Sequence, residues 1–266
     1  MDSLFSHTLL RNKDVAYLFG EKPTIPTNWR RKYNDISPKE IPYKKKKILA
    51  WDFKDLYNVR RLIYPDTLNT SNKVVLFLTL KGGVSKTCTA SQVAFSAALQ
   101  GYKVLFVDLD HQQDGTSAIG VPYNGVKHTI YNVLVNETPI EESIIELNHN
   151  LHVIGANNDL FSINDQLRAK INRVELLDSA LSKIKDSYDL IILDAHNDKS
   201  ILNMSAIAAS DIVAIPSFCV QSSVNGVINV VNFVTDIISE KGIMNNEIVE
   251  DYEPIIKKHV RIIPTK

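Results

Sequence analysis

The sequence predicts an α/β protein with a mostly parallel, doubly wound sheet, preceded by a small N-terminal domain. Three observations support this. Short runs of β-branched residues alternate with longer helical patterns from residue 74 onward, a glycine-containing loop follows the first run, and residues 1–64 show a different pattern. A chain of 266 residues with 44% apolar content can bury a core of this size.

Residues 1–64 are predicted to form two short helices about a turn, a basic segment and a further helix. In "KDVAYLFGEKPTIPTNWRRK", Gly20 is expected to end the first helix and Thr27 to cap the second. The basic "YKKKKILAW" and the helical "DFKDLYNVRRLIY" follow, which is the layout of a winged helix-turn-helix. Trp29 and Trp51 are expected in its core. Residues 65–73 lack periodicity and are predicted to be a linker to a second domain, residues 74–266.

Six apolar runs are predicted to be the strands of the second domain. They are apolar almost throughout, as strands buried on both faces should be, and the segments between them can hold covering helices. The runs are "VVLFL", "KVLFVD", "LHVIG", "LIILD", "IVAIP" and "VRIIP". A helix is predicted after the first strand over residues 86–100, with Gly101 as its stop.

Charge is distributed unevenly along a chain whose net charge is zero. Residues 1–72 hold 14 Lys and Arg against 8 Asp and Glu, whereas the remainder holds 16 against 22. This suits a nucleic-acid-binding head on an acidic body, and a solvated lysine-rich surface is the alternative. The N-terminus lacks the order of a secretory signal, and no apolar run approaches the ~20 residues that span a bilayer, which favours a cytoplasmic protein.

The loop after the first strand, "LKGGVSKT", is close to a phosphate loop. Leu80 and Ser85 stand where the pattern G-x-x-x-x-G-K-[ST] has glycines, but Lys86 and Thr87 are retained. In such loops backbone N–H groups and the N-terminus of the next helix converge on phosphate. We expect Lys86 to reach the β and γ phosphates and Thr87 to bind Mg²⁺. The predicted nucleotide-binding residues are Lys81, Gly82, Gly83, Val84, Ser85, Lys86, Thr87 and Cys88.

Two aspartates end predicted strands and complete the predicted metal site with Thr87. Asp108 ends "KVLFVD" and Asp194 ends "LIILD", so both should lie at the carboxyl edge of the sheet and hold the water shell of Mg²⁺. Either could instead cap a helix or a turn. Asp110 follows closely, and its alternative reading is a solvated turn residue.

"KGGVSKT", followed by "VLFVDLDHQQ" and later "YDLIILDAH", resembles the ParA-type partition ATPases, whose deviant Walker A motif reads K-G-G-x-x-K-[ST]. The resemblance covers residues 74 to about 234 and implies a P-loop NTPase sheet that binds ATP and Mg²⁺. It also implies that Lys81 reaches the nucleotide of a partner in a homodimer and that Asp110 orients the attacking water. Lys81, Lys86 and Asp110 are therefore the predicted catalytic residues.

The chain departs from this family in three places. His111 stands where the family usually has proline, and residues 194–198 read "DAHND" where the family reads D-x-P-P-S. A lone loop histidine such as His196 is expected to be a hydrogen-bonded surface residue. The family's chain continues beyond a sequence like "RIIPTK" to its base-binding residues, so the resemblance leaves adenine selectivity without assigned residues and leaves open whether the second domain is complete or truncated.

Residues 14–62 resemble the MerR-like winged helix-turn-helix in front of large plasmid ParA proteins. "TNWRRK" is then the recognition helix, and the lysine run is the wing along the phosphate backbone. A solvated loop is the alternative for the lysine run. The predicted DNA contacts are Asn28, Arg30, Arg31, Lys32, Lys44, Lys45, Lys46 and Lys47.

The resemblance implies a nucleoid-associated ATPase that segregates plasmid or chromosomal DNA. It would dimerise with ATP, bind operator and non-specific DNA, engage a ParB-type centromere-binding protein and autoregulate its operon. The alternative is a DNA-binding repressor whose nucleotide site has lost hydrolysis. A membrane-directed MinD-type relative is not favoured because the expected C-terminal amphipathic helix is missing from the sequence, and a nitrogenase-iron-protein relative would need cluster cysteines.

Overall fold

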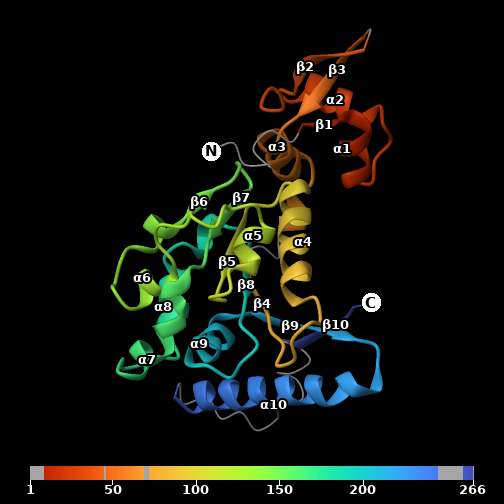
Figure 1. Ribbon diagram of the computed structural model, residues 1–266. Helices are drawn as coiled ribbons and strands as arrows, with labels where there is room; N and C mark the ends of the chain where they lie inside the picture. Colours follow the sequence, from red (N-terminus) through yellow and green to blue (C-terminus); the bar gives the residue numbers. More distant parts are fainter. Residues whose placement is uncertain (1–8, 45, 69–71, 245–259, 266) are drawn as a thin grey trace.

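The computed structural model describes residues 9–44, 46–68, 72–244 and 260–265. A small N-terminal unit stands at one end of a larger α/β unit, directly beyond the end of helix α4 (Figure 1). The chain runs from the small unit into the sheet of the larger one through α3.

The N-terminal unit combines three helices with a three-stranded antiparallel sheet of order β1–β3–β2. Its elements are β1 (Leu10–Arg11), α1 (Asn12–Leu18), α2 (Ile25–Lys32), β2 (Lys39–Tyr43), β3 (Lys46–Trp51) and α3 (Phe53–Ile63). Trp29 and Trp51 are buried, as predicted, and their rings meet edge to face at 6.4 Å. Gly20 follows α1 with a φ of +69°, which confirms it as the stop of that helix.

The expectation that Thr27 caps the second helix is wrong. α2 already begins at Ile25, with Pro26 in its first turn, where proline is favoured because its φ is preset to a helical value and it has no N–H of its own to leave unsatisfied. Thr27 therefore lies inside the helix. Its Oγ1 accepts a hydrogen bond from Nδ2 of Asn12 at 2.8 Å, which ties α2 to α1.

The larger unit is a seven-stranded sheet of order β10–β9–β4–β8–β5–β7–β6. Neighbouring strands are parallel except β6 and β7, which pair antiparallel. The strands are β4 (Lys73–Phe77), β5 (Val104–Asp108), β6 (Ile145–Glu146), β7 (Leu151–Ile154), β8 (Leu190–Asp194), β9 (Ile212–Phe218) and β10 (Val260–Thr265). All six predicted strands are present, and β6 adds a short edge.

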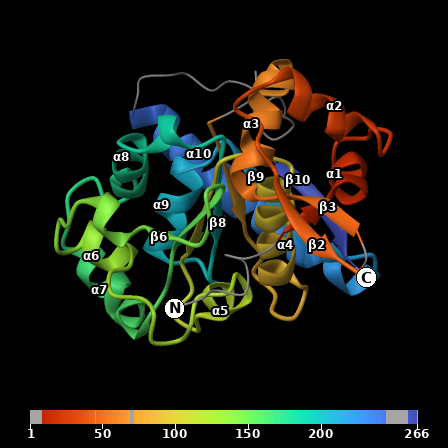
Figure 2. The same cartoon turned by 90° about the horizontal axis from the view of Figure 1, so that it is seen from above.

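Helices cover both faces of this sheet (Figures 1 and 2). α4 packs on one face through Ala90, Ala94 and Ala98, whereas α8, α9 and α10 pack on the other. The α-helices of the unit are α4 (Lys86–Leu99), α5 (Asp114–Ala118), α6 (Ile130–Leu134), α7 (Ile163–Arg168), α8 (Leu176–Ser182), α9 (Ile201–Ala209) and α10 (Gln221–Met244). Short 3₁₀ turns span Pro65–Leu68, Ile140–Ser143, Asn158–Ser162 and Lys185–Ser187.

Successive residues of each central strand belong to different cores. In β5, Val104 and Phe106 lie in the core beneath α4, and Leu105 and Val107 lie in the core beneath α8 and α9. Side chains of a strand alternate between the faces of a sheet, so a strand covered on both faces must be apolar at every position. This is the physical reason why the continuous apolar runs predict strands.

α3 joins the two units at the C-terminal end of α4. Gly101 follows that helix with a φ of +84°, and a Cβ at this position would overlap the carbonyl oxygen of Leu56 in α3. Nε of Arg60 donates to the carbonyl of Gln100 at 2.7 Å. Phe53 packs in the core beneath α4, so α3 belongs to the packing of both units.

Candidate functional site

The predicted nucleotide and metal residues meet at the carboxyl edge of the sheet. The phosphate loop connects β4 to α4, and the register of β5 and β8 places Asp108 beside Asp194. β4 pairs with both β8 and β9, so the chain winds outward from it in both directions. Ligands of open α/β sheets bind at such a point.

The phosphate loop includes two residues in the left-handed region. Gly83 has a φ of +76°, which costs glycine little, whereas Ser85 has a φ of +60°, which costs a non-glycine residue about 1–2 kcal/mol. The carbonyl of Ser85 accepts hydrogen bonds from N and Oγ1 of Thr89, at 2.9 and 2.7 Å. Lys81 is exposed, while Val84 is buried. The first turn of α4 thus fixes the end of the loop through Thr89, while the side chain of Lys81 is exposed to solvent.

Lys86, Thr87 and Asp194 are brought together beneath this loop. Nζ of Lys86 donates to Oδ1 of Asp194 at 2.5 Å and to Oγ1 of Thr87 at 3.3 Å. Lys86 is only 9% exposed, so its ammonium depends on this carboxylate for compensation. An incoming phosphate would offer the same compensation.

Asp194 and Asp108 form a buried pair of carboxylates. Burial raises the pKa of Asp194, against the opposing effect of the Lys86 ammonium. Burial, and then the charge of Asp194, raises the pKa of Asp108 to about 7. Oδ2 of Asp194 is buried and has no hydrogen-bond partner among the described residues. Two neighbouring carboxylates with one oxygen unsatisfied are a donor set that fits Mg²⁺.

Asp108 itself is held by the start of α5. Its Oδ2 accepts hydrogen bonds from N and Oγ1 of Thr116, both at 2.7 Å, and its Oδ1 accepts from the N–H of Asp110 at 3.0 Å. A Cβ on Gly115 would lie 2.9 Å from Oδ2 of Asp194. Our sequence reasoning missed Gly115 and Thr116. The signal for them was a glycine and a threonine soon after a strand-ending aspartate.

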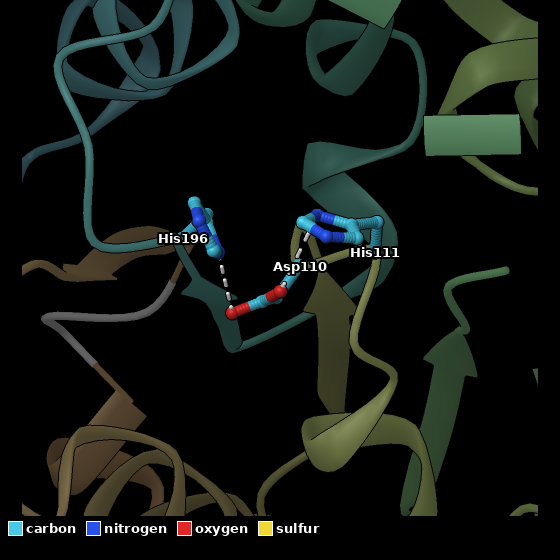
Figure 3. A group of neighbouring side chains, drawn as sticks. All are labelled: Asp110, His111 and His196. Atoms are coloured by element: carbon cyan, nitrogen blue, oxygen red, sulfur yellow. Dashed lines mark ion pairs between the residues drawn. The ribbon is translucent and has the colours of Figure 1, made fainter. Parts of the chain in front are cut away.

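Asp110 lies in a turn and faces two histidines (Figure 3). Its Oδ1 accepts a hydrogen bond from the N–H of Gln112 at 2.9 Å. Oδ2 lies 3.0 Å from Nδ1 of His196, and Oδ1 lies 3.8 Å from Nδ1 of His111. His196 is partly exposed, as expected of a surface histidine, but it is not alone: the loops after β5 and β8 lie side by side, which brings His196 to Asp110.

The loop that contains His196 is fixed from both sides. The buried Asn203 of α9 donates from Nδ2 to the carbonyl of His196 at 2.7 Å and to Oδ1 of Asp198 at 2.8 Å. On the other side, Nδ2 of Asn197 lies 3.4 Å from the place of a Cβ on Gly82. The loop after β8 thus packs against the phosphate loop, and Asn197 and Asn203 are further residues that the sequence alone did not point to.

The predicted DNA contacts lie on α2 and on the β2–β3 hairpin, which extends away from the larger unit (Figure 1). In α2, Asn28, Arg31 and Lys32 are exposed and share one face, since residues three and four apart lie together on a helix. Arg30 is exposed elsewhere and pairs with Glu40 at 3.1 Å. Of the hairpin residues, Lys44, Lys46 and Lys47 are exposed, and Lys45 lies outside the described residues.

Across the part of the chain that the structure describes, no helix is both long enough and apolar enough to cross a bilayer.

Residues 72–249 match the protein-family model AAA_31, described as AAA domain. Among curated proteins, the sporulation initiation inhibitor protein Soj of Bacillus subtilis is 33% identical over 163 residues, covering 61% of this chain and 64% of its own. The chromosome partitioning protein ParA of Myxococcus xanthus is 35% identical over 159 residues, covering 59% of this chain and 56% of its own. The matches thus span about three fifths of the relatives' length.

Solved structures with the same fold include two that are 25% identical to the chain. Cobyrinic acid a,c-diamide synthase from Mycobacterium smegmatis, with bound ATP analog and magnesium, covers 62% of this chain and 66% of its own with a TM-score of 0.59. A plasmid partition protein from Borrelia burgdorferi covers 62% and 74%, with a TM-score of 0.54.

Proposed function

Since the chain belongs to the AAA_31 family of P-loop ATPases through residues 72–249, we propose that it is a ParA-type partition ATPase. It binds ATP with Mg²⁺, dimerises, binds DNA, and segregates a plasmid or chromosome with a ParB-type partner. The observation that carries the proposal is the meeting of Lys86, Thr87 and Asp194 beneath a K-G-G-x-x-K-T loop. The similarity to Soj and ParA supports the same assignment.

The phosphates of ATP are bound by the backbone N–H groups of residues 82–87 and by Lys86. The ammonium of Lys86 leaves its ion pair with Asp194 and pairs with a phosphate instead. Thr87, Asp194 and Asp108 would hold Mg²⁺. When bound, it neutralises charge on the phosphates and draws electron density from them. When Lys86 leaves Asp194, the carboxylate of Asp194 becomes free to bind the cation. Binding of ATP and binding of Mg²⁺ are therefore coupled.

Hydrolysis requires a water in line with the bond that breaks. Asp110 orients this water, whose oxygen forms a bond to the γ-phosphorus while the bond from that phosphorus to the bridging oxygen breaks. The products are ADP and inorganic phosphate, and the phosphate carries away the protons of the water. Lys81 extends into solvent and serves the nucleotide of the other subunit. This assignment of Lys81 makes turnover depend on dimerisation.

The N-terminal unit is proposed to be a winged helix-turn-helix that binds operator and non-specific DNA. α2 supplies the base-reading face, and the β2–β3 hairpin supplies lysines for the phosphate backbone. Binding of the operator would let the protein repress its own operon, and binding of non-specific DNA would keep it on the nucleoid in the cytoplasm. The exposure of the basic side chains on both elements supports this.

A DNA-binding repressor with an idle nucleotide site is the second candidate. It is favoured by one observation: both carboxylate oxygens of Asp110 face histidines, which would compete with a water for them. A ParA-type motor needs that carboxylate to be available. The two candidates therefore differ in whether Asp110 contributes to turnover.

ATP turnover of the purified protein separates the candidates, measured with and without DNA and the partner protein. We expect DNA and partner to stimulate the wild type, Asp110→Ala to bind ATP but to turn over at least ~10²-fold more slowly, and Lys86→Ala to lose nucleotide binding. Lys81→Ala should retain binding and lose stimulated turnover. Equal turnover of wild type and Asp110→Ala under stimulation would instead support the repressor.

A further inference from the structure

Asp110, His111 and His196 form a compact group of ligand atoms (Figure 3), next to the buried Asp108 to which the N–H of Asp110 donates. One ligand atom from each side chain lies within 4.8 Å of the others. The three residues come from two loops, one after β5 and one after β8. The proposed hydrolysis assigns a role to Asp110 alone and leaves both histidines unexplained.

The spacing of these atoms is near that of ligands around one cation, and the shorter of the two distances is also that of a direct ion pair. Ligands about 2.0–2.2 Å from one ion lie roughly 3–3.5 Å from each other. Nδ1 of His196 lies 3.0 Å from Oδ2 of Asp110, and Nδ1 of His111 lies 3.8 Å from Oδ1. Nδ1 of His196 is buried, yet within the described ranges it makes no hydrogen bond of acceptable geometry, even to Asp110.

Neighbouring amide side chains orient both histidines by hydrogen bonds, as second-layer residues do around a metal ion. Nε2 of His111 lies 2.9 Å from the side-chain amide of Gln112, whose oxygen and nitrogen can exchange places by a flip. With its oxygen toward the ring, the amide accepts from Nε2–H and leaves Nδ1 free to bind a metal. The backbone of His196 is fixed by Asn203 at 2.7 Å.

We propose that Asp110, His111 and His196 bind a divalent transition metal of the Zn²⁺ class, at a site separate from that of Mg²⁺. Two imidazole nitrogens and one carboxylate suit Zn²⁺, whereas Mg²⁺ prefers oxygen ligands. The histidine side chains are 27% and 30% exposed, so solvent can reach the ion and fill its remaining positions.

Occupancy of this site has a consequence for turnover, and this part rests on the proposed function. A metal bound to the carboxylate of Asp110 removes the group that orients the attacking water. Zn²⁺ is therefore an inhibitor that leaves the Lys86 and Thr87 side of the site intact. ATP binding should persist while hydrolysis falls.

The binding test uses the full chain, freed of metal by a chelator and without nucleotide. Titration calorimetry should find one strong Zn²⁺ site that excess Mg²⁺ does not displace, and Co²⁺ should give a visible spectrum without cysteine charge transfer. His196→Ala and His111→Phe should each weaken Zn²⁺ binding at least ~10-fold. His111→Phe keeps an aromatic ring against Phe161, which the histidine ring meets at 5.5 Å.

The matched control is His149→Ala, because His149 is exposed and precedes β7 at the opposite edge of the sheet. Its Zn²⁺ affinity should equal that of the wild type. The proposed metal site would be overturned if the wild type bound no Zn²⁺ or if both cluster variants bound it with unchanged affinity. Displacement of Zn²⁺ by Mg²⁺, or thiolate bands with Co²⁺, would overturn it as well. In a turnover assay, Zn²⁺ should inhibit the wild type and not His111→Phe. A wild type without turnover would sink the proposed function and leave the metal-binding result standing.

Discussion

At the scale of single residues, the site contains two unfavourable features, a pair of buried carboxylates and a strained backbone conformation. Binding of a cation would relieve the repulsion between the carboxylates. Asp108 and Asp194 stand side by side with no exposed surface, and Ser85 holds a left-handed φ of +60°. Such features persist only where the surrounding structure enforces them. Thr116 favours the ionised form of Asp108 against the rise in pKa that burial causes, because its N–H and its hydroxyl both donate to that carboxylate.

We predict that Thr116→Val destabilises the nucleotide-free protein by about 1–3 kcal/mol, since it leaves a carboxylate oxygen and the N–H of Ala156 without the hydroxyl they share. The loss should be larger at pH 8 than at pH 5. The hydroxyl favours the charged form, and the pKa of Asp108 is about 7, so its contribution is fully present only above that pH. Urea unfolding across this range measures it. Thr116→Ser, which keeps the hydroxyl, is the control, and a pH-independent loss would contradict the explanation.

The same buried carboxylates predict how the unliganded protein responds to pH. Asp108 binds its proton more tightly when folded, with a pKa of about 7 against 3.8, so its contribution to stability declines as pH rises from about 4 to about 7. Mg²⁺ with ATP should offset this decline. Thermal midpoints with and without Mg-ATP should therefore diverge as pH rises from 5 to 8, and parallel curves would count against the metal role of this pair.

A further prediction at this scale concerns α2. Arg31 shares its exposed face with Asn28 and Lys32, whereas Arg30 is paired with Glu40. We expect Arg31→Ala to weaken operator binding by about 1–3 kcal/mol and Arg30→Ala to have a smaller effect. Fluorescence anisotropy with operator and scrambled DNA measures both. If Arg30→Ala is the more damaging change, the assigned face is wrong.

At the scale of elements, α4 links the nucleotide site to the N-terminal unit. Its N-terminus begins at Lys86 of the phosphate loop, and its C-terminus contacts α3 through the carbonyls of Gln100 and Gly101. Arg61 of α3 also pairs with Asp189 at 2.8 Å, next to the start of β8. The junction is therefore made by two arginines of α3 that contact the last carbonyls of α4 and the carboxylate of Asp189.

We predict that Gly101→Ala destabilises the protein by at least ~1–2 kcal/mol. Alanine is strained at a φ of +84°, and its Cβ would overlap the carbonyl oxygen of Leu56, so α3 must shift. Denaturant unfolding measures the loss. Gln100→Ala is the control, because Arg60 contacts the backbone and not the side chain of Gln100. Equal stabilities of the two variants would show that the helices do not depend on this approach.

At the scale of the whole molecule, the proposed DNA-binding and nucleotide-binding surfaces lie far apart. The lysine hairpin stands at one extreme of Figure 1, and the phosphate loop lies at the far end of α4. The hairpin lysines should contribute only electrostatic affinity, because they follow the phosphate backbone and do not read bases.

We therefore predict that replacing residues 44–47 by alanine weakens binding to all DNA sequences alike. The slope of log K against log salt should fall by about 0.9 for each phosphate that the hairpin no longer neutralises, while basal ATP turnover stays unchanged. Binding measured at several salt concentrations tests this, with operator and random DNA compared. A weakening confined to the operator would show that the hairpin reads bases.

Much of the larger unit was predictable because its signals are local. A strand buried on both faces must be apolar throughout, so β4, β5, β7, β8, β9 and β10 were visible as runs, and Gly101 marked the end of α4. The start of α2 was misjudged because Pro26 can begin a helix as well as Thr27 can cap one. The preference of proline for the first turn of a helix competed there with the preference of threonine for the N-cap. In the structure, Thr27 lies inside α2 and accepts a hydrogen bond from Asn12 of α1.

The sequence by itself determined the alternation of strands and helices, the deviant phosphate loop and the aspartates at the strand ends, because each depends on neighbours along the chain. Only the tertiary structure decided which loops meet. Parallel pairing of β5 with β8 brings His111 and His196 to Asp110, and it places Gly115 and Thr116 against the buried carboxylates. Nothing in the local sequence of two separate loops tells how far apart they lie in space. The order of the strands in the sheet decides which loops become neighbours, and that order is a property of the tertiary structure.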